Sequence, residues 1–480
     1  MTTLVFVHGW SVNDTSTYGQ MPELLQQRAA ADGMTLTLAD VWLSEYVSFD
    51  DAVTISDLVH AFDRALRDLH LRDASFACVT HSFGGPVVRE WLRAQRQQPG
   101  RCSTIKLTHL VMLAPANFGS ALARLGSEVL GELKAWWHAI QPGRQLLEWM
   151  ELGSAASLEL NLDSIHGPDP TARGQYLFVL TGDRPDRALY DYLIPYTGED
   201  GSDGVVRIAA ANLNAQHAVL GWNGKAAGMY VDELSLDLTR GPRFAFKIIA
   251  GAAHSGALHG ILHSAAPFTA DEILRCLGIR EKRDYLALTE AFDRENGQRD
   301  DNRVELESAD PYPARVHIHD PRSQLIVRIT DDSGEALTDA GFLLTAGPQA
   351  SPDLMPPGFM LDRQVNARHL NTVTLFLNHT LLAGSVRVAH PANARQTLRP
   401  TITSHRPYGA NVQPANLTGL VHHALSLSQA GDDLFTMLGA HQTTVLDVVL
   451  SRKIHAGVFR LTQDLAPQDF SNPVPGPIIG

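Results

Sequence analysis

Residues 76–89 read Phe-Ala-Cys-Val-Thr-His-Ser-Phe-Gly-Gly-Pro-Val-Val-Arg and decide the fold class of this chain. An apolar run leads into Ser82, and an apolar helical pattern follows it. The residues two before and two after the serine, Thr80 and Gly84, are small. A serine on such a tight strand-to-helix turn is lifted out at the carboxyl edge of a sheet, where its hydroxyl is reachable. The alternative is a serine that only caps a helix in a glycine-rich turn. The context of strand before and helix after favours the first interpretation.

The same alternation of short apolar runs and helical patterns extends from residue 1 to about residue 277. Apolar residues between Ile55 and Leu69 recur at spacings of one, three and four, which is typical of one helical stripe. The pattern predicts an α/β domain over residues 1–285, with a mostly parallel sheet flanked by helices. We expect its strands at residues 4–7, 35–38, 76–79, 107–113, 176–180 and 244–249.

Residues 118–172 interrupt this alternation with a stretch that is rich in leucine and includes Trp136, Trp137 and Trp149. One interpretation is a mobile amphipathic cover inserted over one edge of the sheet. The other is a pair of permanent core helices, because aromatic residues at helical spacing usually pack inside. The sequence leaves both interpretations open.

The C-terminal part of the chain has a different pattern of apolar and polar residues. Residues 286–315 are dense in charge and predict a linker. From residue 316 to 480, short alternating runs separated by turn signals predict a β-rich domain, such as a sandwich, of unknown role. Its polar stretch Asp331-Asp332-Ser333-Gly334-Glu335 is explained better by a turn between strands than by a calcium site. The expected strands are 316–319, 325–330, 342–345, 372–377, 386–388, 444–450 and 457–461.

Composition narrows the class of protein. The 480 residues are 44% hydrophobic and 19% charged, which fits a globular chain of more than one domain and excludes general disorder. A net charge of −13 argues against a nucleic-acid partner. Cys78, Cys102 and Cys276 lack the spacing of a disulfide framework or a zinc site, so we expect no metal. With neither a signal peptide nor a transmembrane run evident, we expect a cytoplasmic chain as synthesised, whose export would need a route without a signal.

The segment Thr80-His81-Ser82-Phe83-Gly84-Gly85 resembles the nucleophile elbow of α/β-hydrolase lipases and esterases. Thr80 stands where the usual motif has its first glycine. The segment Leu4–Trp10, with His8-Gly9 after an apolar run, is similar to the strand and turn that carry an oxyanion donor in these enzymes. The resemblance implies that the backbone N–H groups of Trp10 and Phe83 form the oxyanion hole.

In this fold the acid and then the base follow the serine along the chain. Asp183, Asp186, Asp200 and Asp203 all qualify as the acid by position. We prefer Asp203, because its Asp-Gly-Val-Val segment resembles the one that supplies the acid in bacterial lipases. The base is expected in the loop after the strand at 244–249, where His254 ranks first and His259 and His263 are alternatives.

These assignments predict a serine carboxylic-ester hydrolase that acts on lipid esters, as a lipase or phospholipase, through an acyl-enzyme and without a cofactor. Residues 113–120, Leu-Ala-Pro-Ala-Asn-Phe-Gly-Ser, resemble the segment that leads into the lid of lipases. The resemblance implies that the stretch at 118–172 is such a lid and favours a lipid ester as the substrate, including one presented by a membrane surface. An acyltransferase would use the same triad. A binding protein that had kept the fold without turnover is the third alternative.

Overall fold

The computed structural model describes most of residues 1–285, which the resemblance predicts to be an α/β-hydrolase domain and which are called the hydrolase part below. It also describes the centre of the C-terminal part, residues 316–480. The described residues are 2–8, 18–48, 50–69, 71, 75–98, 100, 102, 104–124, 143–185, 199–223, 233–256, 259–262, 267–299, 304–307, 315–331, 333–338, 340–345, 353, 355–381, 399–404, 412–414, 437–450 and 452–454.

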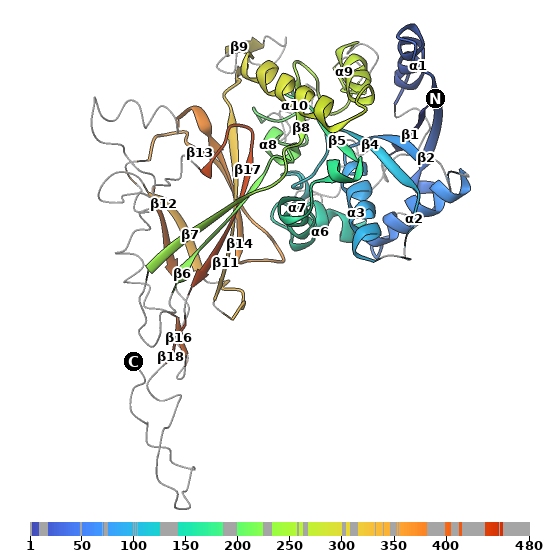
Figure 1. Cartoon of the computed structure of the whole chain (residues 1–480). Coiled ribbons are helices and arrows are strands. Elements are labelled where there is room, and N and C mark those ends of the chain that lie inside the picture. Colours follow the sequence, from blue (N-terminus) through green and yellow to red (C-terminus); the bar gives the residue numbers. More distant parts are fainter. Residues whose placement is uncertain are drawn as a thin grey trace, which may run out of the picture.

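A six-stranded, fully parallel sheet forms the hydrolase part, in the order β2-β1-β3-β4-β5-β8. Each of the six strands predicted for residues 1–285 lies in it. The α/β-hydrolase fold class is confirmed, with a second mixed sheet beside it (Figure 1). The strands are β1 (Thr2–His8), β2 (Leu36–Trp42), β3 (Ser75–His81), β4 (Lys106–Leu113), β5 (Tyr176–Gly182) and β8 (Ala245–Ile249).

Helices cover both faces of this sheet because its strands are apolar on both sides. Along β1, Leu4 and Phe6 join one buried cluster and Val5 and Val7 join the other. The first cluster includes residues of α1 (Met21–Ala31), α9 (Pro267–Leu277) and α10 (Lys282–Gly297). The second includes residues of α2 (Ile55–Asp68), α3 (Gly84–Gln97), α6 (Arg144–Met150), α7 (Ala155–His166) and α8 (Ile208–Ala211). Short 3-10 turns lie at Leu43–Glu45 (η1) and Pro170–Arg173 (η2).

The second sheet also has six strands, in the order β13-β14-β11-β17-β6-β7, and it is mixed. Two of its strands, β6 (Gln216–Asn223) and β7 (Glu233–Arg240), come from the range predicted as the catalytic domain. The others are β11 (Arg322–Asp331), β13 (Met360–Val365), β14 (Thr372–Asn378) and β17 (Thr443–Leu450). The chain therefore enters this sheet as a hairpin before returning to β8, so sheets and sequence ranges do not coincide.

Three two-stranded ribbons complete the described C-terminal part. They pair β9 (Val304–Glu307) with β10 (Arg315–Ile318), β12 (Ala340–Thr345) with β15 (Arg399–Ser404), and β16 (Val412–Pro414) with β18 (Arg452–Ile454). The strands expected at 386–388 and 457–461 lie outside the described residues. Residues 286–297, which the sequence placed in a charged linker, continue α10. They pack with α10 on β8, because Leu288 and Phe292 are buried there while the charges face outward.

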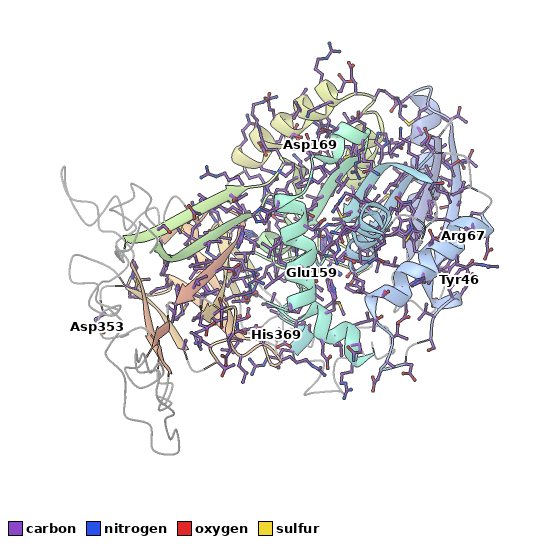
Figure 2. The ribbon with its side chains drawn as sticks, turned by 60° about the horizontal axis from the view of Figure 1, so that its bottom comes forward. Tyr46, Arg67, Glu159, Asp169, Asp353 and His369 are labelled. Carbon is purple, nitrogen blue, oxygen red and sulfur yellow. The ribbon has the colours of Figure 1, made fainter. Side chains whose placement is uncertain are left out.

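The two sheets share a hydrophobic core. Along β11, Leu325, Val327 and Ile329 point into a cluster of the C-terminal part, whereas Ile326 belongs to the hydrolase cluster. Such alternation is the two-residue period of a strand with both faces covered. In Figure 2, His369 marks the turn between β13 and β14 near helices α6 and α7, and Tyr46 and Arg67 mark the far side of the hydrolase part. Strands β6, β7 and β11 of the second sheet thus pack against helices α7 and α8.

Candidate active site

Ser82 follows β3 directly, on the turn that opens α3. Its φ is +52°, a left-handed conformation that non-glycine residues rarely adopt. Close packing of the turn holds this strained backbone: the Ser82 N–H donates to Leu113 O (2.9 Å), and a Cβ at Gly85 would lie 3.0 Å from Pro115 Cβ. Strain of this kind concentrates at functional sites. The turn therefore has the geometry that the sequence predicted for a nucleophile elbow.

Thr80 occupies the position where a glycine was expected, and the structure explains why it fits. A Cβ at Gly84, across the turn, would lie 3.5 Å from Thr80 Cβ, which is ordinary van der Waals contact. Thr80 itself is completely buried. The side chain of Thr80 therefore does not crowd the start of α3, and the turn does not need a glycine at position 80.

His254 reaches Ser82 from the loop after β8. Its Nε2 lies 3.1 Å from Ser82 Oγ, and its Nδ1 lies 3.0 Å from Asp203 Oδ2. A carboxylate only accepts, so Nδ1 carries the proton toward Asp203 and the Nε2 lone pair faces the serine hydroxyl. Asp203 and His254 are 0% and 4% exposed, whereas Ser82 is partly exposed. The structure therefore brings together the three side chains that the sequence proposed.

The Asp203 carboxylate is oriented by its own loop. Asp203 Oδ1 accepts the backbone N–H groups of Val205 (3.0 Å) and Val206 (2.8 Å), which leaves Oδ2 for the imidazole. The backbone of the two residues is also linked, since His254 N–H donates to Asp203 O at 2.9 Å. The acid and base loops are thus held by two independent contacts.

His81 contributes to the site in a way that the sequence did not predict. Its Nε2 donates to the backbone oxygen of His254 at 3.0 Å, and the centroids of the His81 and His254 rings lie 4.7 Å apart. This contact fixes the loop that carries the imidazole. The only signal in the sequence was the place of His81 next to the nucleophile.

The alternative acids and bases lie elsewhere or outside the described residues. Asp183 accepts Gly251 N–H at 2.6 Å and pairs with Arg299. The side chain of His259 is exposed, and its backbone oxygen binds Ala253 N–H at 2.8 Å. Asp200 is half-buried and lies in the same loop as Asp203, whereas Asp186 and His263 lie outside the described residues.

Phe83, one of the two expected oxyanion donors, caps the N-terminus of α3. Its ring packs edge-on against Trp149 of α6, with centroids 5.0 Å apart. The other expected donor, Trp10, lies in residues 9–17, outside the described residues. Trp149 is 5% exposed and belongs to the hydrolase core, as the permanent-helix interpretation expects. Trp136 and Trp137 are also outside the described residues, so the lid interpretation stays a prediction.

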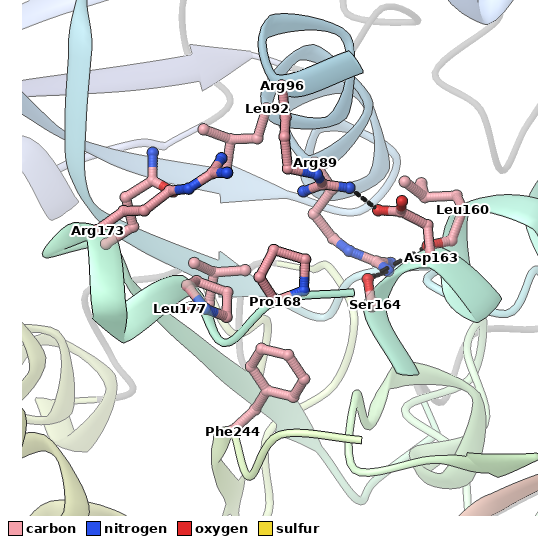
Figure 3. Close-up of a pocket in the computed structure, with 12 residues that line it drawn as sticks. Arg89, Leu92, Arg96, Leu160, Asp163, Ser164, Pro168, Arg173, Leu177 and Phe244 are labelled. Atoms are coloured by element: carbon pink, nitrogen blue, oxygen red, sulfur yellow. Dashed lines mark hydrogen bonds and ion pairs between the residues drawn. The ribbon is translucent and has the colours of Figure 1, made fainter. Parts of the chain in front are cut away.

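A pocket beside α3 is distinct from this arrangement (Figure 3). Its lining includes Arg89, Arg96 and Asp163, and none of the three side chains around Ser82 lines it. Arg89 is buried and donates to neutral oxygens, among them Ser164 Oγ at 2.8 Å, and burial lowers its pKa to about 9. Arg96 pairs with Asp163 across the gap between α3 and α7. These contacts hold the two helices together behind the nucleophile turn.

Among the described residues, no cluster of histidine, cysteine and acidic side chains suits a metal ion. The part of the chain that the structure describes also contains no helix with the length and apolarity to cross a bilayer.

Comparisons with solved structures give full-length similarity. Phospholipase PlaB from Legionella pneumophila, in complex with thio-NAD, is 34% identical, with a TM-score of 0.81 and 100% of both chains covered. A second structure of that phospholipase is 34% identical, with a TM-score of 0.81 and 98% of each chain covered. The mature lipase BlEst2 from Bacillus licheniformis is 18% identical over 44% of this chain and 79% of its own, with a TM-score of 0.32.

Comparison with protein-family models gave no match, and comparison with curated protein sequences gave none. The likeness to the Legionella phospholipase nevertheless spans both chains from end to end at 34% identity. The fold and this relationship agree, and the chain belongs to the phospholipase PlaB family of serine ester hydrolases with the α/β-hydrolase fold.

Proposed function

We propose that this lipid-ester hydrolase cleaves phospholipid acyl esters through a Ser82–His254–Asp203 triad and an acyl-enzyme. The observation that carries the proposal is the unbroken chain of hydrogen bonds from Ser82 Oγ through His254 to Asp203, in which only the serine is partly exposed. The phospholipid class rests on the likeness to a phospholipase over the whole chain.

The geometry supports the following steps. His254 Nε2 takes the proton of Ser82 as its Oγ attacks the ester carbonyl, and Asp203 stabilises the imidazolium that forms. The backbone N–H groups of Phe83 and Trp10 bind the oxyanion, each contributing roughly 2.7 to 4 kcal/mol. The imidazolium then gives its proton to the leaving alcohol, and a water molecule activated by His254 releases the fatty acid.

The test compares the wild type with Ser82→Ala on phosphatidylcholine vesicles and on p-nitrophenyl esters of increasing chain length. We expect Ser82→Ala to abolish release of fatty acid, and Ser56→Ala, on the exposed surface of α2, to retain it. A fluorophosphonate should label Ser82 in the wild type, detected as a mass increase on its tryptic peptide. Turnover that survives in Ser82→Ala would contradict the proposal.

The same experiment separates the alternatives. Addition of an acceptor alcohol, with quantification of the new ester against free fatty acid, distinguishes an acyltransferase from a hydrolase. A protein that binds the vesicles but releases nothing from any ester would fit a binding protein instead.

A further inference from the structure

Hydrogen bonds between residues close in sequence hold the loop that carries Asp203, residues 199–208, in one conformation. Ser202 Oγ donates to Glu199 O at 2.8 Å, and Gly204 N–H donates to Ser202 Oγ at 3.1 Å. The backbone of Ser202 also pairs with that of Arg207 as an isolated antiparallel β-bridge. Ile208 N–H donates to Gly201 O at 3.0 Å. A displacement of Arg207 therefore moves the backbone that presents Val205 and Val206 N–H to the Asp203 carboxylate.

Arg207 is fixed by both parts of the chain. Its side chain is 1% exposed, and its Nε and one Nη donate to the two carboxylate oxygens of Glu199 at 2.8 and 2.9 Å. The same Nη also pairs with Asp362 of β13. The guanidinium lies over the ring of Phe376 of β14, 4.2 Å from its centroid. Burial alone would lower the pKa of Arg207, but the Glu199 and Asp362 carboxylates outweigh this effect and raise it.

The packing around this ion pair leaves little room for movement. A Cβ at Gly201 would lie 2.6 Å from Arg322 Cγ and 3.4 Å from Phe376 Cζ, so the loop runs directly against the second sheet. A buried charge that loses one partner is costly, and a planar guanidinium stacked on an aromatic ring has a defined orientation. The contacts therefore specify where Arg207 lies as well as holding the sheets together.

We propose that Arg207 is a positioning residue through which Asp362 and Phe376 of the second sheet hold the triad acid in its reactive orientation. This inference rests on the proposed triad, since its effect passes from Arg207 through the N–H groups of Val205 and Val206 to Asp203. It assigns the C-terminal part a role inside the catalytic machinery. A misplacement of about 1 Å at a catalytic group can cost roughly 100-fold in rate.

The test uses Asp362→Asn and Phe376→Leu in the full chain, with p-nitrophenyl esters as the substrate. We expect each variant to lose about 10- to 100-fold in kcat with KM changed less than about threefold, because the acid is displaced while the substrate pocket is kept. The acidic limb of the kcat/KM profile should move to lower pH, because His254 loses stabilisation of its cation. Phe376→Leu changes no charge, so a shift in that variant reports orientation and not long-range electrostatics.

The matched control is Arg368→Gln, which removes another ion pair between the two parts. Arg368 pairs with Glu148 of α6, and neither residue belongs to the 199–208 loop. We expect this variant to keep kcat within about twofold. If Asp362→Asn, Phe376→Leu and Arg368→Gln all changed kcat equally and only slightly, the positioning role would be refuted. The contacts of Arg207 would then only stabilise the packing of the two parts.

Two further variants cover failure to fold and failure of the triad. If Asp362→Asn and Phe376→Leu unfold, Arg207→Lys keeps the charge but loses the two-pronged contact with Glu199, and it should show the same loss of kcat and the same pH shift. A wild-type kcat in Arg207→Lys would overturn the proposal. Ser82→Ala is run in parallel: activity in that variant refutes the proposed triad, whereas an inactive Ser82→Ala beside unaffected positioning variants refutes this inference alone.

Discussion

Replacing Asp203 with asparagine tests the site most directly, because the structure dictates how the new amide must lie. Asp203 Oδ1 accepts two backbone N–H groups, at 3.0 and 2.8 Å, and Oδ2 lies 3.0 Å from His254 Nδ1. An asparagine keeps the two backbone bonds only with its oxygen at the Oδ1 position, so its NH₂ group then faces Nδ1. The imidazole must accept at Nδ1, and its proton moves to Nε2, 3.1 Å from Ser82 Oγ. In that tautomer the ring cannot take the serine proton.

The magnitude follows from the cost of the opposite orientation. Turning the amide would leave two buried N–H donors without an acceptor, at about 1–3 kcal/mol each. The unreactive orientation is therefore favoured by about 2–6 kcal/mol, and the imidazolium also loses its counter-charge. We expect kcat to fall by about 10⁴-fold, the loss seen when the acid of a serine-protease triad becomes an amide. This corresponds to about 5.4 kcal/mol in the barrier.

The assay is the initial rate of p-nitrophenyl ester hydrolysis at saturating substrate, with the thermal midpoint measured to confirm folding. The comparison variant is Asp183→Asn, because the sequence also allowed Asp183 as the triad acid and because Asp183, like Asp203, is buried. Its carboxylate binds Gly251 N–H and Arg299 instead of the imidazole, so we expect its kcat to fall less than about tenfold. A kcat for Asp203→Asn within tenfold of the wild type, or a larger loss in Asp183→Asn, would refute this reasoning.

Two other predictions concern stability. Gly182→Ala should lower the free energy of unfolding in urea by about 1–3 kcal/mol, because its Cβ would lie 2.0 Å from Ala252 O. Gly297→Ala, with nothing within 4 Å, should not destabilise, and equal losses in both would contradict the packing argument. The hydrogen bond from Arg275 holds the pKa of Glu295 at about 2, below its ordinary 4.5, so this carboxylate stabilises the fold above pH 4.5 and loses that effect as pH falls toward 2. Glu295→Gln should therefore show a smaller drop in stability over that interval, and an unchanged drop would show that Glu295 does not supply it.

The hydrolase sheet was predictable from local sequence. Strands that are buried on both faces have short apolar sequences, so β1, β3, β4 and β5 were recognisable. The turn at Ser82 was recognisable because small residues stand two positions before and after the serine. The acid and base were narrowed to a few residues by chain order, but Asp183 and Asp203 could be ranked only by resemblance. Distances in the folded chain separate them, since only Asp203 reaches the imidazole.

The placement of β6 and β7 was not predictable in the same way. These strands lie between two strands of the first sheet in sequence, yet β6 pairs with β17, more than two hundred residues later, and β7 pairs with β6. A strand pattern reports that a segment is extended, and it does not report which partner it finds. The helix at 282–297 was hidden for another reason, because its exposed face is densely charged and resembles a linker.

The sequence by itself determined the class of fold, the nucleophile turn and the short set of residues from which a triad is built, because each depends on neighbours a few positions away. Only the tertiary structure decided which carboxylate meets the imidazole, that His81 fixes the base loop, and that Arg207 joins Asp362 across 155 residues. The first two contacts depend on how the loops at one edge of the first sheet meet, and the third depends on how the two sheets pack. Such packing is a property of the assembled core that no local pattern encodes.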